Sequence, residues 1–373
     1  MKKKHIVCMI IIAAIFLYGI AGLVGCADYY ADDDINLRSP QRTVPAVTQR
    51  PLAATPAQTI ASTQTTTPGT GAPLFTSMNR HILAPDAARA MSESMLTNYK
   101  ALVDAVYERS SWVAVTLPLS EALECIEIFN AGFANFLVSR LEVRTPYNNR
   151  IYITYRYTAQ RQREMVDFIE GEYIRILNSI IRREFNDFER TLAVYRYFAT
   201  RISYNSDWDK SSQKLEDQFL PAVDIYEALI TNKGVCFSYS FLCQYALLQM
   251  NIDAFNLFGI PSWDNTQYHA WLVVRLNGNF YHIDPTWDAG RGGESLRFFG
   301  MTDSDRIQSG ILEEFIQRNR IRPEYGAIKA TDSTVFNIFR NVSSWEFMGN
   351  HRIRLTMSNN SSSIFNAVTM RVE

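Results

Sequence analysis

Two stretches decide the fold: Gly234-Val235-Cys236-Phe237-Ser238-Tyr239, and HAWLVVRLNGNFYHIDPTWD from His269 to Asp288. The first stretch opens an apolar run that continues to Met250, which predicts a helix with Cys236 in its first turn and a tight turn at Gly234. The partial positive charge of a helix N-terminus stabilises a thiolate. Cys236 therefore suits nucleophilic catalysis, although a purely structural cysteine at a helix start fits the same pattern.

The second stretch predicts a β-hairpin. Asn277-Gly278 is a strong two-residue turn signal, and apolar strands flank it over 270–276 and 279–283. Residues of one parity share a face, so His269, His282 and Asp284 are predicted on the same side, with His269 and Asp284 within hydrogen-bonding reach. The two-residue turn predicts the facing pairs Val273–His282, Trp271–Asp284 and His269–Thr286.

These side chains permit several chemistries. Asp284 could fix the tautomer of His269 and stabilise its imidazolium, which completes a triad with Cys236 if the helix packs on that face. His282 could instead be the base, or the two histidines and Asp284 could bind a metal as a two-histidine, one-carboxylate face. The same residues could also be satisfied polar groups at a sheet edge.

The other two thiols of the globular region are predicted to be core residues. Cys125 lies among apolar residues of a predicted helix, and Cys243 lies two turns beyond Cys236 on its helix. Two helical turns separate Cys236 and Cys243 by about 10 Å, which is too far for a disulfide.

The three motifs together resemble the transglutaminase-like superfamily of papain-fold thiol enzymes. The motifs are the stretch around Cys236, His269-Ala270-Trp271, and Asp284-Pro285-Thr286-Trp287-Asp288, and the resemblance covers about residues 161–308. It implies an α+β fold in which the cysteine-bearing helix packs on an antiparallel sheet. It also implies that residues 296–301 resemble the strand that closes this core. Phe237 is a departure, because many members have a small or polar residue there.

The resemblance implies a mechanism of acyl transfer through a thioester. Cys236 would be the nucleophile, His269 the base and Asp284 the orienting acid, in a transferase or a peptidase acting on glutamine or peptide amides. The backbone N–H of Cys236 is one candidate oxyanion donor, and Tyr204 is a second, although Tyr204 could equally be a packed aromatic. The calcium-binding segments of the family are not evident, so we expect no metal and no cofactor.

The N-terminus resembles a bacterial lipoprotein signal. Met1-Lys2-Lys3-Lys4-His5 is basic, residues 6–25 are apolar or small, and Cys26 follows as the residue that would be lipidated. This pattern predicts a protein anchored by lipid outside the cytoplasm, at the cell surface or in a periplasm, where cell-wall peptides or surface proteins are plausible substrates.

Composition sets the remaining expectations. The 373 residues carry a net charge of −1 and 47% hydrophobic residues, which excludes a disordered chain, and without clustered positive charge we expect no nucleic-acid partner. A binding module or a surface adhesion scaffold remains the alternative to an enzyme. The predicted units are a signal with lipobox over 1–26, a Thr/Pro-rich tether over 27–77, a small α/β domain over 78–160, a transglutaminase-like domain over 161–308 and a β-rich extension over 309–373.

Overall fold

The computed structural model describes residues 72–131, 136–206, 225–263, 269–313 and 334–373, with short pieces at 316, 321–322, 326–327 and 329–330. Its mixed helices and antiparallel sheets confirm the predicted α+β class. The predicted signal, Cys26 and most of the predicted tether lie outside the described residues. None of the helices in the described part of the chain combines the length and apolar character needed to cross a membrane.

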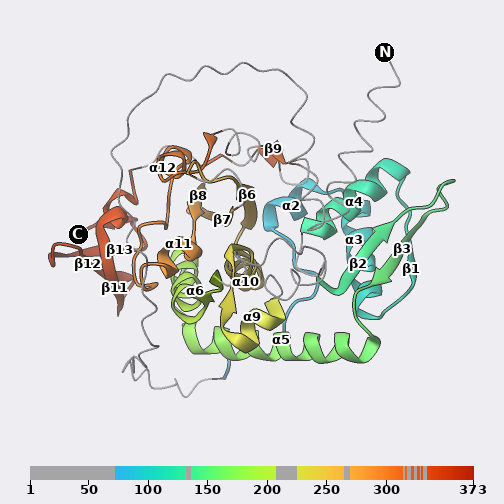
Figure 1. The fold of residues 1–373 in the computed structure, drawn as a ribbon, viewed down its shortest axis with the longest axis horizontal. Helices are drawn as coiled ribbons and strands as arrows, with labels where there is room; N and C mark the ends of the chain where they lie inside the picture. Colours follow the sequence, from blue (N-terminus) through green and yellow to red (C-terminus); the bar gives the residue numbers. More distant parts are fainter. Residues whose placement is uncertain are drawn as a thin grey trace, which may run out of the picture.

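The first described unit is a three-stranded antiparallel sheet with helices on one side (Figure 1). The sheet order is β1-β3-β2, and Ile151 and Ile153 of β3 point into a core that also buries Cys125. The elements are α2 (Pro85–Ala90), α3 (Glu93–Tyr107), β1 (Trp112–Ala114), α4 (Leu119–Ala131), β2 (Val138–Glu142) and β3 (Arg150–Tyr155).

Helix α5 (Ala159–Ile180) runs along the base of the molecule beneath both halves (Figure 1). Thr158 caps its first turn by accepting a hydrogen bond from the N–H of Arg161. Val166 belongs to the core of the small unit, whereas Tyr173, further along, belongs to the larger core and donates its hydroxyl to the carbonyl of Leu242. One helix therefore packs into both cores.

The centre of the molecule is helix α10 (Cys236–Gln249), which packs on the sheet and on helix α6. The predicted helix is thus confirmed, with Cys236 as its first residue. Before it come α6 (Asp187–Arg201), β4 (Ser203–Tyr204), α9 (Ile225–Thr231) and β5 (Lys233–Gly234), and β4 pairs in parallel with β5.

The central sheet has the antiparallel order β6-β7-β8. Strands β7 (His269–Leu276) and β8 (Asn279–Ile283) form the predicted hairpin, with Leu276 opposite Asn279 and Val273 opposite His282 as expected. Asn277 and Gly278 both take positive φ, which a type I′ hairpin turn requires. Strand β6 (Ala254–Gly259) pairs with the other edge of β7.

The hairpin is shorter than predicted at its open end. The ladder stops at Leu272 and Ile283, so the pairs Trp271–Asp284 and His269–Thr286 do not form. Asp284 instead becomes the N-cap of α11 (Pro285–Ala289), because aspartate favours that position and Pro285 suits the first helical turn. The predicted closing strand over 296–301 is also wrong, since this segment makes only a single bridge, from Met301 to His282.

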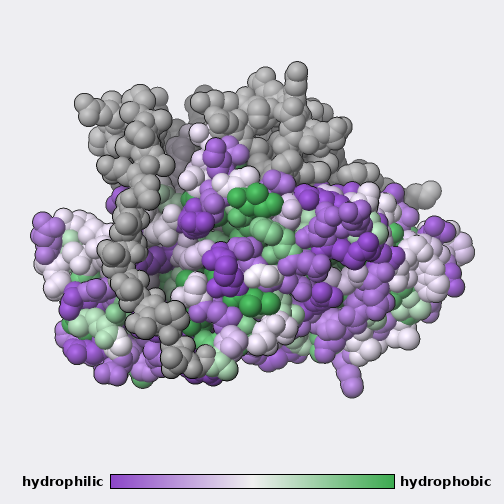
Figure 2. Space-filling view, turned by 90° about the horizontal axis from the view of Figure 1, so that it is seen from below, coloured by the Kyte–Doolittle hydropathy of each residue, from purple (hydrophilic) through white to green (hydrophobic). Residues whose placement is uncertain are grey.

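The C-terminal residues form a four-stranded antiparallel sheet, in which Ile353, Leu355 and Met357 alternate along one strand. Those three side chains do face the core, which they share with the central sheet. Seen from below, the described surface is mostly hydrophilic, with small apolar areas near its centre (Figure 2). The last elements are α12 (Asp303–Gln308), β9 (Ile321–Arg322), β10 (Gly326–Ala327), η3 (Asn337–Asn341), β11 (Val342–Gly349), β12 (Arg352–Met357), β13 (Ser362–Asn366) and β14 (Arg371–Val372).

Candidate active site

The packing of α10 places Cys236 at one end of the central sheet. Phe237 stacks on Phe258 with 5.3 Å between ring centroids, and Phe258 pairs with Ala270, the residue after His269. Further along the helix, Gln244 donates to the carbonyl of Ala254 at the far end of β6. The first turn of α10 therefore lies at the end of the sheet where β7 begins, and Phe237 serves as a packing residue.

Helix α10 packs on the face of the sheet opposite to His269, whereas the sequence makes a complete triad conditional on packing against the face of His269. The side chains that contact it, Asn256 and Phe258, share the face of Ala270 and Leu272, whereas His269 and Trp271 have the opposite parity. Helix α10 contacts β7, which begins at His269, and it also contacts α11, which follows Asp284. Trp287 of α11 stacks on His269 with 4.8 Å between ring centroids.

His269 and Asp284 form the buried pair that the sequence predicts. The Nε2 atom of His269 lies 2.6 Å from Oδ2 of Asp284, and the two residues are 6% and 0% exposed. This bond uses Nε2, so Nδ1 is the ring nitrogen that remains for a proton transfer. The arrangement can orient an imidazole as a general base or acid.

Asp284 is held as a carboxylate by four donors. Oδ1 accepts from the backbone N–H groups of Thr286 and Trp287, and Oδ2 accepts from His269 and from Nη2 of Arg306 at 2.9 Å. Burial alone would raise the pKa of Asp284, but the charges of His269 and Arg306 and these hydrogen bonds outweigh it and hold the pKa below its ordinary value.

Arg306 of α12 completes this cluster and was missed by the sequence reasoning. Its side chain is fully buried, and its Cζ lies 4.5 Å from the ring centroid of Trp271 and 4.0 Å from that of Trp287. Cation–π contacts of this kind compensate part of the loss of hydration. Burial lowers the pKa of Arg306 to about 10 despite the charge of Asp284, which leaves the guanidinium charged at neutral pH.

His282 is committed to a separate hydrogen-bond network. The indole N–H of Trp271 donates to Nδ1 at 2.9 Å, which requires the proton of a neutral imidazole to be on Nε2, 2.9 Å from Oδ1 of Asp303. Burial lowers the pKa of His282 even though Asp303 opposes this effect. Because both ring nitrogens are hydrogen-bonded, His282 is a buried polar residue whose hydrogen bonds are satisfied. It does not fit the alternatives of a catalytic base or a metal ligand.

A second carboxylate lies one helical turn beyond Asp284. Asp288 accepts at Oδ2 from the hydroxyl of Tyr195 at 2.6 Å and from the N–H of Phe298 at 3.1 Å. Tyr195 also donates to the carbonyl of Asp284, so α6 contacts both residues. Burial raises the pKa of Asp288 to about 7. Nothing in the sequence distinguished Asp288 from the rest of its motif.

Tyr204 lies beside the strand that leads to Cys236. It pairs with Gly234 across β4 and β5, and the N–H of Asn205 donates to the carbonyl of Gly234. Tyr204 is 43% exposed, so the alternative interpretation of Tyr204 as a packed aromatic residue is wrong. Its role as an oxyanion donor stays a prediction.

The remaining thiols of the described region have the predicted character. Cys125, Cys236 and Cys243 are all buried and none of the three is in a disulfide, and Cys125 and Cys243 lie in the two cores. Burial raises the pKa of Cys125 to about 12 and raises that of Cys243 further. Neither forms a thiolate readily, which leaves Cys236 at a helix N-terminus as the thiol suited to chemistry.

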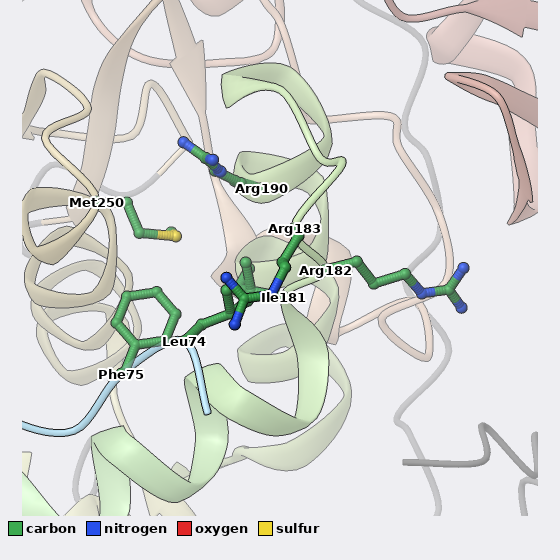
Figure 3. Close-up of a pocket in the computed structure, with 7 residues that line it drawn as sticks. All are labelled: Leu74, Phe75, Ile181, Arg182, Arg183, Arg190 and Met250. Carbon is green, nitrogen blue, oxygen red and sulfur yellow. The ribbon is translucent and has the colours of Figure 1, made fainter. Parts of the chain in front are cut away.

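A cavity of about 310 Å³ lies at the loop between α5 and α6 (Figure 3). It combines an apolar side formed by Leu74, Phe75 and Met250 with arginines, of which Arg182 points away from the apolar residues in Figure 3. None of its lining residues belongs to the cluster around His269, so we do not assign it to the candidate active site.

One family model matches part of the chain. Residues 171–288 match the family model of a transglutaminase-like domain, DUF553, and this range contains Cys236, His269 and Asp284. No curated protein matches the sequence.

Two solved structures are similar at 16% identity. One is a TGase crystal structure, with a TM-score of 0.29, 40% of this chain covered and 44% of that chain covered. The other is a provisionally assigned cysteine protease from Cytophaga hutchinsonii, with a TM-score of 0.25, 32% of this chain covered and 37% of that chain covered. The chain therefore spans less than half the length of either structure.

Proposed function

We propose that this protein is a thiol enzyme of the transglutaminase-like class, with Cys236 as nucleophile, His269 as acid and base, and Asp284 as the orienting carboxylate. The observation that carries the proposal is the buried His269–Asp284 hydrogen bond at the end of the sheet where α10 begins with Cys236. The match of residues 171–288 to a transglutaminase-like domain supports it.

The proposed reaction proceeds through a thioester. The Cys236 thiolate attacks the carbonyl carbon of a glutamine or peptide amide, a C–S bond forms, and the C–N bond breaks as His269 gives a proton to the leaving amine. Water or a lysine amine then attacks the thioester, His269 accepts its proton, and the thiolate leaves. The backbone N–H of Cys236, with Tyr204 as a second donor, would bind the oxyanion.

The proposed location is outside the cytoplasm, with the chain anchored through a lipid on Cys26. The basic start, apolar run and cysteine at the N-terminus support this proposal. The substrates would then be proteins or peptides at the cell surface or in a periplasm, including cell-wall peptides.

A non-catalytic binding module or adhesion scaffold is the alternative function. The burial of Cys236, which is only 4% exposed, favours it, because a thiol that substrate cannot reach performs no chemistry. The triad residue types would then be structural, as Asp284 already is through its capping of α11.

Thiol alkylation mapped by mass spectrometry across pH 5–9 separates the two functions. We expect Cys236 of the intact protein to react well below pH 8, with Cys125 and Cys243 protected, and His269→Ala to slow the reaction at Cys236 at least tenfold. His81→Ala is the matched control, because His81 contacts Asp104 of α3 on the exposed surface of the first unit and should leave the rate unchanged.

A substrate assay then tests the chemistry. Incubation with a glutamine peptide alone, quenched in acid, should give a thioester on Cys236 by mass with release of ammonia, and an added amine probe should convert it to a peptide–probe amide with the free thiol restored. Cys236→Ala should abolish both products. A Cys236 that reacts no faster than Cys125, or whose rate ignores His269, would refute the enzymatic proposal and favour the binding module.

A further inference from the structure

We infer that strand β1 of the first unit is a docking edge for an extended, acidic segment of a partner protein. This strand (Trp112–Ala114) is an outer strand in the order β1-β3-β2, and it lies on the side of the molecule away from the central sheet (Figure 1). An edge strand with unpaired backbone groups can accept one more strand from another chain. The inference does not depend on the chemistry proposed for Cys236.

The backbone of β1 has hydrogen-bonding groups that its own sheet does not use. The N–H of Val115 donates to the carbonyl of Asn149 on the side of β3. Because the backbone groups of successive residues alternate between the two edges of a strand, Trp112 and Ala114 direct their N–H and C=O groups away from β3. Within the described ranges, no hydrogen bond reaches these outward groups.

The other edge of the same sheet is protected against such pairing, whereas β1 is not. Strand β2 is bulged between Val138 and Arg140, and Arg140 forms an ion pair with Glu142 at 2.7 Å. Bulges and charged side chains at an edge discourage the addition of another strand. The pairing of β1 with β3 has no bulge, and residues 111–115 include neither proline nor a charged residue. Strand β1 is therefore the edge that can extend this sheet.

The exposed face of the sheet beside β1 carries positive charge that is not balanced. The guanidinium of Arg150 lies over the ring of Trp112 at 3.9 Å, and that of Arg144 lies over the ring of Tyr152 at 3.7 Å. In the part of the chain that the structure describes, neither arginine forms an ion pair with a carboxylate. A guanidinium has five N–H donors and binds a carboxylate through two of them at once. The charge complement of this face is therefore an acidic side chain.

A strand added to β1 would bring acidic side chains to this charge. Residues of the added strand that lie opposite Trp112 and Ala114 project on the same face as those two residues. Ala114 is small and pairs with Arg150 across the sheet, while the guanidinium of Arg150 lies over Trp112, which is already on the edge strand. Neighbouring strands are about 4.8 Å apart, so a glutamate on the added strand can reach that guanidinium. The segment that fits has an acidic residue at every second position.

The test is the fluorescence anisotropy of a labelled peptide, acetyl-TETETET-amide, titrated with the full-length protein. We expect this peptide to bind at least about tenfold more tightly than TQTQTQT, with an affinity that falls as salt is added. Arg150→Gln should weaken binding at least about tenfold. Arg140→Gln is the matched control, because Arg140 lies in the same sheet but already pairs with Glu142, and it should change the affinity less than about twofold.

Ala114→Pro tests the backbone contact, because proline removes an outward N–H that β1 does not use within its own sheet. This variant should lose peptide binding while Cys125, which is buried in the core of the same unit, stays protected from alkylation. If Ala114→Pro does not fold, a TETETET peptide with N-methylated glutamates tests the same contact on the wild-type protein. It should not bind, because the methyl groups block the peptide nitrogens that would pair with β1 in an antiparallel strand.

Two results would overturn the inference. One is equal affinity for TETETET and TQTQTQT, or no measurable binding of either peptide. The other is binding of TETETET that persists in folded Ala114→Pro or with N-methylated glutamates. Polygalacturonate, an anionic glycan, serves as the counter-probe, and competition by it that remains undiminished in Ala114→Pro would show a general anion-binding surface in place of strand docking.

Discussion

Asp288 is a carboxylic acid beside the candidate site, and its own protonation changes near neutral pH. Its pKa of about 7 in the folded protein exceeds the ordinary value of 3.8 because the group is buried, with Tyr195 and Phe298 as its donors. Between pH 3.8 and pH 7 the carboxyl of Asp288 is ionised in the unfolded chain but protonated in the folded protein. Stability is therefore fully present at acidic pH and falls as pH rises toward 7.

We predict that Asp288→Asn removes this loss, because the amide cannot ionise. The wild type should lose up to about 4 kcal/mol of unfolding free energy between pH 4 and pH 8 from this group, as the shift of about three units implies. Urea unfolding at several pH values measures it, with Asp187→Asn at an exposed position as control. Parallel pH curves for wild type and Asp288→Asn would contradict the prediction.

At the scale of single elements, the start of α10 depends on a close approach at Gly234. The sequence suggests a tight turn there, but Gly234 does not have positive φ. Its importance is steric, because a Cβ would lie 2.5 Å from Cβ of Ser238, whose hydroxyl accepts from the N–H of Val235. The glycine thus lets the first turn that carries Cys236 close against β5.

Gly234→Ala should therefore displace this turn. We expect a loss of about 1–3 kcal/mol in unfolding free energy from overpacking, and a slower alkylation of Cys236 than in wild type. Gly171→Ala is the matched control, because a Cβ at Gly171 in α5 meets nothing within 4 Å, and it should stabilise the protein by about 0.5–1 kcal/mol. A Gly234→Ala variant with wild-type stability and reactivity would show that Ser238 moves aside at no cost.

The elements that local signals specify were predictable, and those that tertiary contacts specify were not. Asn277-Gly278 determines the hairpin register as far as Leu272 and Ile283, and the predicted bond between His269 and Asp284 forms although Asp284 has left the strand to cap α11. The face that α10 covers depends on Asn256 and Phe258 of β6, and no spacing in the sequence indicates it. The contact of Arg306 with Asp284 could not be predicted either, because an arginine in the last turn of a short helix usually faces solvent.

At the scale of the whole molecule, the C-terminal sheet and the central sheet with its helices share one core. Phe336 stacks on Phe188 of α6 and meets Tyr281 of β8 edge-on, with 5.5 and 4.7 Å between ring centroids. His351 also bonds to the buried Glu189 of α6 at 2.7 Å. The sheet is thus part of the structure that supports the site, and not a separate extension packed on its surface.

We predict that Phe336→Ala weakens the domain as a whole. Loss of this buried ring should cost about 3–5 kcal/mol, and near-UV circular dichroism and the exposure of Cys243 should report one common unfolding transition. Val372→Ala, at a residue 46% exposed, should change stability by less than about 0.5 kcal/mol. Two separate transitions in Phe336→Ala would show that the sheet unfolds independently.

The order of these parts along the chain also sets an order in time. During synthesis from the N-terminus, Cys236 leaves the ribosome before His269 and Asp284, and Arg306 and the aromatic residues of the last sheet follow later. Cys236 is thus made well before the residues that bond to Asp284 and complete the surrounding core. A nascent or truncated chain that ends before Arg306 carries Cys236 without the residues that surround Asp284 in the folded protein.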